Sequence, residues 1–435
     1  MIRSKPWALV YRGQAHVAAR RGSFVFGFWM RPGPRGCKKC TVSLSIALGD
    51  KRLISRLEAQ AYLGYAAIAP VTECVSLAVR ELLDDYARLG NLALAKWLPR
   101  REVLRQRLGQ LIGADSAHIA LCTSATRGLT DLALCLPWRP DDGVLVGDGE
   151  FPGNVSPWQN VAQLFALRVD FLPKLRTRDD DEFLSALEAR LRAGRVRLVA
   201  LSAVQFQTGI RAPIEAVIRL CRAYGAELAV DAIQACGVVP LDVVALDIDY
   251  LVGGAHKWLM ALEGAGFLYV KPECTRKLVP RTAGWLSHEE GLRFLFEGPG
   301  MLRYDRPIKS GIQFMEGTSA NGVGYAALEA ALEPILRLGV PAIFSHVGAY
   351  LDALEAGLLA RGLTSVRPSQ ASRRSGILSF QPPMPRTAAE LVSALREQGI
   401  IATMPDGVVR LAPHFPNGLD EVPCVLAALD IILGD

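Results

Sequence analysis

The stretch that decides the fold is Glu227–Val270, which reads ELAVDAIQACGVVPLDVVALDIDYLVGGAHKWLMALEGAGFLYV. It contains three short apolar runs with the length and composition of buried β-strands. These runs are Glu227–Val230, Tyr250–Val252 and Phe267–Val270. Asp231 directly follows the first run, and Lys257 comes shortly after the second. Because ligands of open α/β sheets lie at the carboxyl ends of the strands, the stretch predicts a sheet with a site at that edge.

On both sides of this stretch, strand-like runs alternate with helical patterns. The further strand-like runs are Ile119–Cys122, Val144–Val146, Val169–Phe171 and Leu198–Leu201. Helical patterns cover Val71–Leu89, Arg101–Ile112, Gly128–Leu136, Glu182–Leu191 and Pro213–Tyr224. This alternation predicts an α/β fold, in which a mostly parallel, doubly wound sheet is covered on both faces.

The C-terminal part has a different pattern of predicted elements. Two longer helical patterns, Tyr325–Leu338 and Phe344–Leu359, precede a β-rich stretch and a closing helix. We therefore expect a smaller α+β C-terminal domain. The predicted division is a basic, poorly ordered extension (1–49), a segment that packs with the small domain (50–70), a large domain (71–325) and the small domain (326–435).

The charge is unevenly distributed. The chain has 49 Lys and Arg against 43 Asp and Glu, but residues 1–49 hold nine basic residues and no acidic one. The remainder therefore carries a net charge of −3. Such a body gives no reason to expect nucleic acid as a partner. No run approaches the roughly 18 apolar residues of a membrane span, so we expect no membrane partner.

The cysteines and the N-terminal residues indicate in which cellular compartment the protein is expected. Nine cysteines scattered along 435 residues do not resemble a disulfide framework, which favours a reducing, cytoplasmic setting. Cys37-Lys-Lys-Cys40 has no second ligand pair nearby, so no metal site is expected. The basic extension has three interpretations: a transit peptide, a signal peptide, or an extension from an early start codon. We favour the last.

Asp231 and Lys257 each have two interpretations. A buried, unpaired carboxylate is costly, so Asp231 at a strand end needs a partner, although a turn or helix-cap role explains it as well. A lone lysine is usually a solvated surface charge. Lys257, however, lies in the apolar and tight stretch Gly253–Trp258, which suits a reactive amine with a lowered pKa.

The stretch resembles the fold-type-I pyridoxal 5'-phosphate (PLP) enzymes of the class V aminotransferase superfamily. This group includes cysteine desulfurases, isopenicillin N epimerase-like proteins and kynureninases. Its pattern is D-x-x-Q followed further along by S-G-H-K-[WLF], and Asp231, Gln234, His256 and Lys257 occupy those positions. The resemblance implies that Lys257 is the catalytic residue and forms a Schiff base with PLP. It also implies that Asp231 pairs with the pyridine nitrogen, Gln234 hydrogen-bonds the ring 3-oxygen and His256 helps to fix the cofactor or its phosphate.

Two segments resemble the family's phosphate loop and ring-stacking position. Ser124, Ala125 and Thr126 end a strand and open a helix, and match the family's phosphate loop approximately. Backbone N–H groups at such a helix start bind anions, although a serine there is equally a good N-cap. Phe151 in Glu150–Asn154 occupies the position whose aromatic ring stacks on the cofactor; the alternative is an ordinary core phenylalanine.

Three further positions follow in the family's order. Many relatives place an Asn near the cofactor in the segment that corresponds to 202–209; Phe206 takes that position here, and Gln205 is the nearest polar substitute. Thr318 in Glu-Gly-Thr-Ser-Ala-Asn matches a Thr that reaches the phosphate of the neighbouring subunit, which implies a homodimer with a shared active site. Arg410 in VRLAPHFPN matches the Arg that binds the substrate carboxylate, a task for a bidentate donor.

Two departures limit the inference about the reaction. Gly254 replaces the family's Ser, so a phosphate hydroxyl is missing unless Thr123, Ser124 or Thr126 compensates. No Cys lies between Cys274 and Arg410, where cysteine desulfurases carry their nucleophile. The resemblance thus implies a PLP-dependent, class V aminotransferase-like enzyme that acts on an amino acid by transamination, epimerisation or elimination. The alternatives are a desulfurase or selenocysteine lyase-type enzyme without the usual Cys, and a non-catalytic PLP-fold binding protein.

Overall fold

A computed structural model describes residues 46–434. Cys37, Cys40 and nearly all of the predicted basic extension lie outside the described residues. From Ile46 onward the chain forms one compact unit. None of the helices within residues 46–434 is long and apolar enough to cross a membrane.

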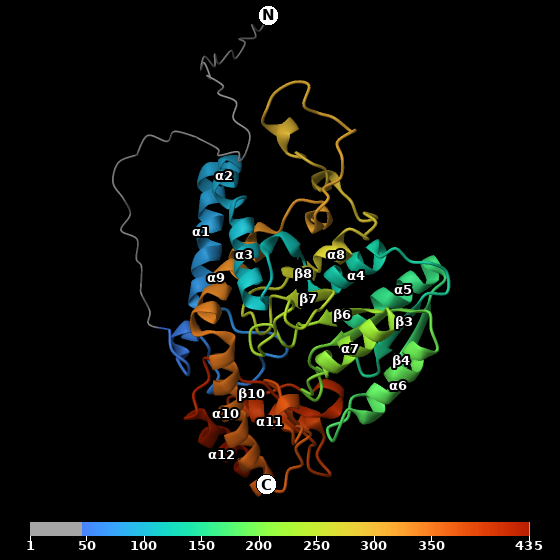
Figure 1. The fold of residues 1–435 in the computed structure, drawn as a ribbon. Helices are drawn as coiled ribbons and strands as arrows, with labels where there is room; N and C mark the ends of the chain where they lie inside the picture. Colours follow the sequence, from blue (N-terminus) through green and yellow to red (C-terminus); the bar gives the residue numbers. More distant parts are fainter. Residues whose placement is uncertain (1–45, 435) are drawn as a thin grey trace, which may run out of the picture. The chain divides into compact units, whose positions relative to one another are not determined.

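A seven-stranded sheet forms the centre of this unit, in the order β2-β8-β7-β6-β5-β3-β4 (Figure 1). The strands are β2 (Ile119–Cys122), β3 (Gly143–Gly147), β4 (Arg168–Leu172), β5 (Val196–Ser202), β6 (Glu227–Asp231), β7 (Tyr250–Gly254) and β8 (Gly266–Val270). Neighbouring strands pair in parallel except at β8, which is antiparallel to both β2 and β7. The predicted α/β fold with a mostly parallel sheet is confirmed.

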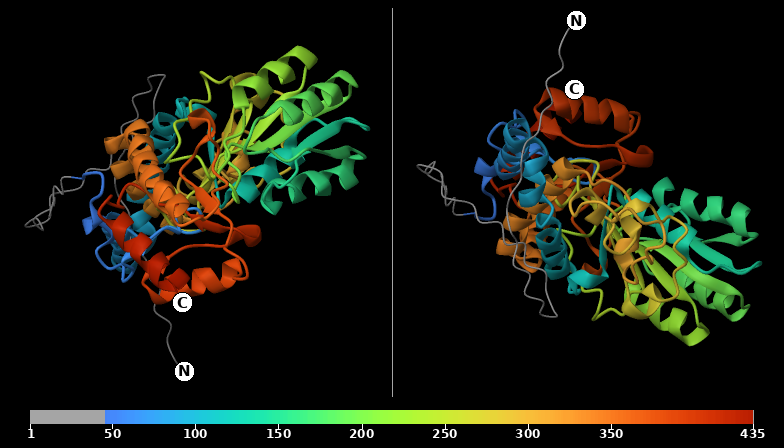
Figure 2. Two further views of the ribbon diagram at one scale, coloured as in Figure 1. Left: turned by 90° about the horizontal axis from the view of Figure 1, so that it is seen from below. Right: turned by 90° about the horizontal axis from the view of Figure 1, so that it is seen from above.

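Helices cover both faces of the sheet (Figure 2). Those nearest the strands are α4 (Ala125–Cys135), α5 (Ser156–Phe165), α6 (Asp181–Arg192) and α7 (Ile214–Tyr224). Because side chains alternate along a strand, Val144 and Leu145 of β3 enter different cores. Val144 belongs to the core that contains Leu129 of α4, whereas Leu145 belongs to the one that contains Leu187 of α6. A strand buried on both faces explains the unbroken apolar runs in the sequence.

A second group of long helices lies beside the sheet. It consists of α1 (Glu73–Leu89), α3 (Arg100–Ile112), α9 (Gly322–Leu338) and α10 (Val340–Ala360), and α1 and α3 both pack on α9 (Figure 1). The two helical patterns expected to end at Leu89 and Ile112 do end there, each directly before a glycine, Gly90 or Gly113. Gly113 has a φ of 73°, a left-handed conformation that suits glycine. The remaining helices are α2 (Leu94–Trp97), α8 (Pro272–Thr275), α11 (Ala388–Glu397) and α12 (Glu421–Gly434).

Two small sheets join the beginning of the described chain to its end. β1 (Ala61–Tyr62) pairs in parallel with β10 (Ile400–Ile401), and β9 (Leu378–Phe380) pairs antiparallel with β11 (Val409–Leu411). Gly64 then bridges to Ala412, directly after β11. Residues near 61–64 are thus held against the strand that carries Arg410. The proposed boundary between a large and a small domain at 325/326 stays a prediction.

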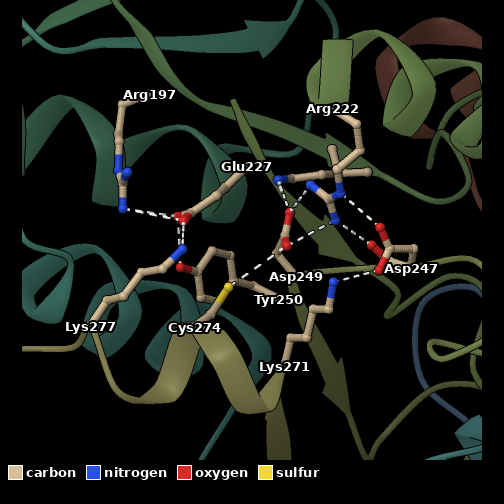
Figure 3. A network of polar contacts seen from close by, with 10 residues as sticks. Arg197, Arg222, Glu227, Asp247, Asp249, Tyr250, Lys271, Cys274 and Lys277 are labelled. Carbon is tan, nitrogen blue, oxygen red and sulfur yellow. Dashed lines mark hydrogen bonds and ion pairs between the residues drawn. The ribbon is translucent and has the colours of Figure 1, made fainter. Parts of the chain in front are cut away.

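Charged side chains occupy the amino-terminal edge of the sheet (Figure 3). The buried carboxylate of Asp249 accepts from Arg222 Nη1 and Nη2, each at 2.9 Å, and from the backbone N–H of Leu228 at 2.8 Å. Glu227, the first residue of β6, accepts from Lys277 Nζ at 2.9 Å. Other members of the network are Arg197, Asp247, Tyr250, Lys271 and Cys274. These acids are satisfied within the protein, so this edge has a structural role.

Candidate active site

The opposite, carboxyl-terminal edge of the sheet gathers most of the predicted site. Of the strands that end there, five contain or are followed by at least one of the predicted residues. Ser124, Ala125 and Thr126 follow β2, Phe151 follows β3, Gln205 follows β5, Asp231 ends β6, and His256 and Lys257 follow β7. This is the edge where open α/β sheets bind ligands.

Lys257 is a largely buried amine without a polar partner. Its Nζ lies 5.6 Å from the centre of the Phe151 ring, and no residue in the described range 46–434 forms a hydrogen bond or ion pair with it. Burial lowers its pKa to about 8; the nearby negative charge of Asp231 opposes this shift and the positive charge of Arg410 adds to it. About a tenth of the amine is therefore uncharged at about pH 7, far more than in a lysine with an ordinary pKa of about 10.4, and this fraction can act as a nucleophile or base.

Asp231 is a buried carboxylate beside this amine. Its side chain is 4% exposed, and Oδ1 accepts a hydrogen bond from the backbone N–H of Ile233 at 2.9 Å. Burial raises its pKa, while the bond from Ile233 and the charge of Lys257 lower it. A carboxylate in such surroundings is stabilised by a cation placed next to it, which the protonated pyridine nitrogen of PLP would supply.

Arg410 is a buried guanidinium without a carboxylate partner. Its Nε donates to Thr403 Oγ1 at 3.0 Å and its Nη1 to the backbone carbonyl of Phe206 at 2.6 Å. Burial lowers its pKa to about 10. Of the three buried arginines in residues 46–434, Arg367 and Arg373 form ion pairs with carboxylates and Arg410 does not. Since an unpaired buried cation is unfavourable, Arg410 is suited to an anionic ligand.

The start of α4 lies against the turn that carries Phe151. Ser124 Oγ accepts from the backbone N–H of Arg127 at 3.0 Å, so Ser124 is the N-cap of α4. A Cβ added to Gly153 would lie 2.5 Å from Thr126 Oγ1. The first N–H groups of a helix have no acceptors within it and attract anions. This helix start can hold the phosphate of PLP with Ser124, Ala125 and Thr126.

Ile233 fills the space of the missing family serine. A Cβ added to Gly254 would lie 2.7 Å from Ile233 Cδ1 and 3.0 Å from its Cγ1. The site therefore replaces a hydroxyl with an apolar contact. The hydroxyls of Ser124 and Thr126 at the α4 start can act in place of the missing phosphate donor.

Gln234 and His256 are engaged by the surrounding protein. Gln234 Oε1 accepts from the indole nitrogen of Trp258 at 2.8 Å, and its Nε2 donates to the carbonyl of Ala66 at 3.0 Å. Among the described residues, one N–H of that amide remains without a partner. The backbone carbonyl of His256 accepts from the N–H of Ala69 at 2.8 Å. Burial, and then the charge of Lys257, lower the pKa of the His256 ring, which favours its neutral form.

Gln205 and Thr318 differ in their burial and in their hydrogen bonds. Gln205 is buried, and its Oε1 accepts from Thr208 Oγ1 at 3.0 Å. Thr318 is exposed, and its hydroxyl makes only a long 3.5 Å bond to the carbonyl of Ser319 within the described part of the chain. Among the described residues, no hydrogen bond joins Thr318 to Lys257 or to the start of α4.

Glu316 holds the segment of Thr318 against β2. Its carboxylate accepts from Arg105 Nη2 at 2.7 Å and from the backbone N–H of Leu121 at 2.9 Å. The Glu of the Glu-Gly-Thr motif therefore has a structural role. It fixes the loop from which Thr318 projects into solvent.

Glu150 is a site residue to which the sequence analysis assigned no role. Its carboxylate accepts from the backbone N–H of Ser202 at 2.6 Å, from the Ser202 hydroxyl and from Asn154 Nδ2 at 3.1 Å. Burial raises its pKa to about 7, and the negative charge of Asp231 contributes in the same direction. The signal in the sequence is an acidic residue shortly after β3 and directly before Phe151, comparable to Asp231 at the end of β6.

Two cysteines lie near the site: Cys236 is buried and Cys122 is half-buried. Burial raises the pKa of Cys122 and of Cys236 to about 12, which disfavours their thiolate forms. In the described part of the chain, Cys424 on α12 is the one exposed cysteine.

Comparisons with known proteins agree with this geometry. The family described as Aminotransferase class-V matches residues 61–408. The chain is 27% identical over 381 residues to an uncharacterized aminotransferase, YcbU, of Bacillus subtilis, covering 86% of this chain and 94% of the relative. It is 28% identical over 341 residues to isopenicillin N epimerase of Streptomyces clavuligerus, covering 76% and 84%.

A solved structure shows the same fold. The structure is similar to the apo form of a cysteine desulfurase from Thermococcus onnurineus NA1, with a TM-score of 0.75 and 22% identity, over 86% of this chain and 94% of the other. At this identity the likeness supports the fold alone. The family match, the strand order and the residues at the carboxyl edge agree: the chain belongs to the class-V aminotransferase family of PLP-dependent enzymes.

Proposed function

We propose that this protein binds PLP covalently through Lys257 and acts on an amino acid whose α-carboxylate is held by Arg410. One observation carries the proposal: within residues 46–434 the buried guanidinium of Arg410 pairs with no carboxylate, and it bonds the carbonyl of Phe206. The ring of Phe206 packs on the Phe151 ring below the Lys257 amine, so that Arg410 and Lys257 belong to one site. Such a pair can hold a substrate by its carboxylate while its amine and Cα lie near the lysine. The amino acid is therefore expected to need a free carboxylate.

The described residues fit PLP in both charge and position. The group supplies an aldehyde that condenses with amines and a cationic ring that accepts electrons from Cα. In the proposal Ser124, Ala125 and Thr126 bind its phosphate, Phe151 covers its ring, and Asp231 faces its ring nitrogen. Gln205, Gln234 and His256 complete the surroundings. Gln234 can contribute the one N–H that its protein partners leave free.

Lys257 has a second task as a base. With a pKa of about 8 its amine can take the proton from Cα and return it. With PLP bound, protonation of Cα on the opposite face would give epimerisation, transfer of the amino group to PLP would give transamination, and departure of a side-chain group would give elimination. The proposal covers these three outcomes.

A desulfurase or selenocysteine lyase-type reaction is the alternative, and the cysteines weigh against its persulfide form. Cys221, Cys236 and Cys274 are buried and Cys122 is half-buried, and burial raises the pKa of each of these four thiols to about 12. A non-catalytic PLP-fold protein is the other alternative. It leaves the unpaired guanidinium of Arg410 without an explanation.

We also propose that two copies of the chain share each active site through Thr318. Beside its loop lies a hollow of about 350 Å³, lined in part by Trp285, Phe296 and Tyr325. Trp285 and Phe296 are 43% and 60% exposed, more than large apolar side chains usually are. A second copy would cover them and bring the exposed hydroxyl of Thr318 toward a cofactor phosphate.

We also propose that the enzyme is cytoplasmic. The cysteines within residues 46–434 are free thiols, in keeping with a reducing compartment.

A panel of amino acids tests the function. The purified protein with PLP is incubated with each L- and D-amino acid, and with the matching amines that lack the carboxylate. We expect spectral change of the cofactor with at least one amino acid and with none of the amines. Arg410→Gln should abolish the response, whereas Arg374→Gln, at a more exposed arginine, should not. An equal response to amines would overturn the role of Arg410, and sulfide release from cysteine would support the desulfurase alternative.

A further inference from the structure

His414 is a buried histidine on the segment that continues from Arg410. Its ring nitrogen Nε2 lies 2.8 Å from the backbone carbonyl oxygen of Trp258, the residue that follows Lys257. The backbone N–H of His414 donates to Asn417 Oδ1 at 2.8 Å, which fixes the histidine at its own end. A single side chain thus links the strand of the proposed carboxylate-binding arginine to the turn of the proposed catalytic lysine.

The Trp258 residue is held at both of its polar groups. Its indole N–H donates to Gln234 Oε1 at 2.8 Å, and its carbonyl oxygen faces His414. On the other side the carbonyl oxygen abuts Gly237, where a Cβ would collide with it. Among the described residues, His414 is the one hydrogen-bond donor to this buried carbonyl. Loss of that donor would leave a buried acceptor unsatisfied.

The surroundings of His414 restrict it to a donor role. Edge-to-face contacts with Tyr65, Trp258 and Phe415, at centroid distances of 5.3, 5.4 and 5.0 Å, enclose its ring. Nδ1 is buried and has no hydrogen-bond partner among the described residues. Burial lowers the pKa of the ring to about 3. The ring is therefore neutral at physiological pH, with its proton on Nε2, because Nε2 faces an acceptor.

We propose that His414 is a positioning residue: its hydrogen bond to the Trp258 carbonyl sets the place of the Lys257 amine relative to Arg410. The inference rests on the function proposed for Lys257. Two residues remote from each other in sequence must present the amine of Lys257 and the guanidinium of Arg410 to one substrate. The hydrogen bond and the enclosed ring make the connection between them rigid. The Lys257 turn then stays in the dry surroundings that lower the pKa of its amine.

A second histidine of the same region provides a matched control. His346 Nε2 lies 2.7 Å from the carbonyl of Asn417, so it also bonds a backbone carbonyl of the C-terminal segment. It has no hydrogen bond to Trp258 or Lys257 in the described part of the chain. A purely structural effect on this segment should be shared by both histidines, whereas an effect on the lysine should be confined to His414.

The test measures the amine of Lys257 directly. Full-length protein freed of PLP is mixed with PLP from about pH 6.5 to about pH 10, and the rate of covalent capture is followed by absorbance. The midpoint of the profile reports the pKa of the amine, about 8 in the wild type. We expect His414→Phe to raise this midpoint by about half a unit or more, because a loosened turn admits water. His414→Gln, which keeps an N–H donor near the same place, should restore it.

The control defines the outcomes. His346→Phe should leave the midpoint unchanged even if it lowers the melting temperature. An unchanged midpoint in His414→Phe, or equal shifts in both variants, would overturn the inference. If His414→Phe does not fold, His414→Gln is compared with the shorter His414→Asn, and only the glutamine variant should keep the wild-type midpoint. If the wild type captures no PLP on Lys257, the proposed function itself fails, which separates the two results.

Discussion

The guanidinium of Arg410 donates a hydrogen bond to the backbone carbonyl of Phe206 at 2.6 Å. Phe206 in turn packs edge-on against Phe151, with ring centres 5.4 Å apart, and the Phe151 ring lies beneath the Lys257 amine. Uncharged groups therefore orient Arg410, and its positive charge stays available for a ligand. Many relatives have an Asn at the position of Phe206. Here the backbone oxygen of Phe206 accepts the bond from Arg410, so the phenylalanine side chain does not disrupt this contact.

Thr403 is expected to tune substrate binding through Arg410. Thr403→Val removes the acceptor of the Arg410 Nε bond, and a hydrogen bond to a charged group contributes about 1.5–3 kcal/mol. We predict that KM for the responding amino acid rises roughly tenfold or more, with a smaller change in kcat. Steady-state kinetics check this. Thr275→Val, which loses a bond at the far edge of the sheet, should leave KM unchanged.

Gly254 and Ile233 should behave as a coupled pair. Gly254→Ser alone forces its Cβ against Ile233 and is predicted to destabilise the protein by about 1–3 kcal/mol. Gly254→Ser combined with Ile233→Ala should recover stability. The new hydroxyl should then tighten PLP binding by roughly tenfold through a bond to the phosphate. Urea denaturation and PLP titration measure both effects, and strictly additive changes in stability would contradict the coupling.

The network at the amino edge of the sheet should matter for stability and not for binding. Arg222→Ala leaves the buried carboxylate of Asp249 without its ion pair, which we expect to cost about 3 kcal/mol. Arg192→Ala breaks an exposed pair with Glu188 and should cost under about 1 kcal/mol. Urea denaturation compares the two variants. Weaker PLP binding by folded Arg222→Ala would show that this edge does influence the site.

Thr318 is predicted to act across a dimer. Thr318→Val should weaken PLP binding, and Lys257→Ala should abolish covalent capture. Mixed dimers of the two variants contain one site with both wild-type groups if Thr318 works on its neighbour. We expect such mixtures, after subunit exchange, to regain part of the tight covalent binding that neither variant has alone. No recovery in dimers shown to be mixed would place Thr318 in its own subunit's site or outside any site.

The sequence predicted the strands and the residues at their ends well, because each of these features is local. Apolar runs mark the strands, and Asp231 and Lys257 stand where strands end. The sequence could not show that Ile233 occupies the space next to Gly254. It also could not show that the side-chain amide of Gln234 is hydrogen-bonded to Trp258 and Ala66. Such contacts join residues whose proximity depends on the packed fold.

Glu150 and His414 illustrate the same limit. The sequence assigns neither residue a role, and the importance of each comes from its surroundings: His414 is fully buried and the Glu150 carboxylate is enclosed by hydrogen-bond partners. Glu150 meets Ser202 of β5, and His414 meets Trp258. The relevant pKa shifts follow from burial, which depends on side chains contributed by many elements.

Chemical trapping at Lys257 is the most direct test of the proposed site. The protein is incubated with PLP, reduced with borohydride and digested, and the modified lysine is identified by mass spectrometry. We predict a single reduced PLP adduct on Lys257, lost in Lys257→Ala and retained in the control Lys174→Ala, which removes an exposed amine that lies 4.0 Å from Asp406 Oδ2. Its formation should accelerate as the pH rises through about 8, because the amine then loses its proton. An adduct on another lysine, or capture by Lys257→Ala at the wild-type rate, would contradict the assignment.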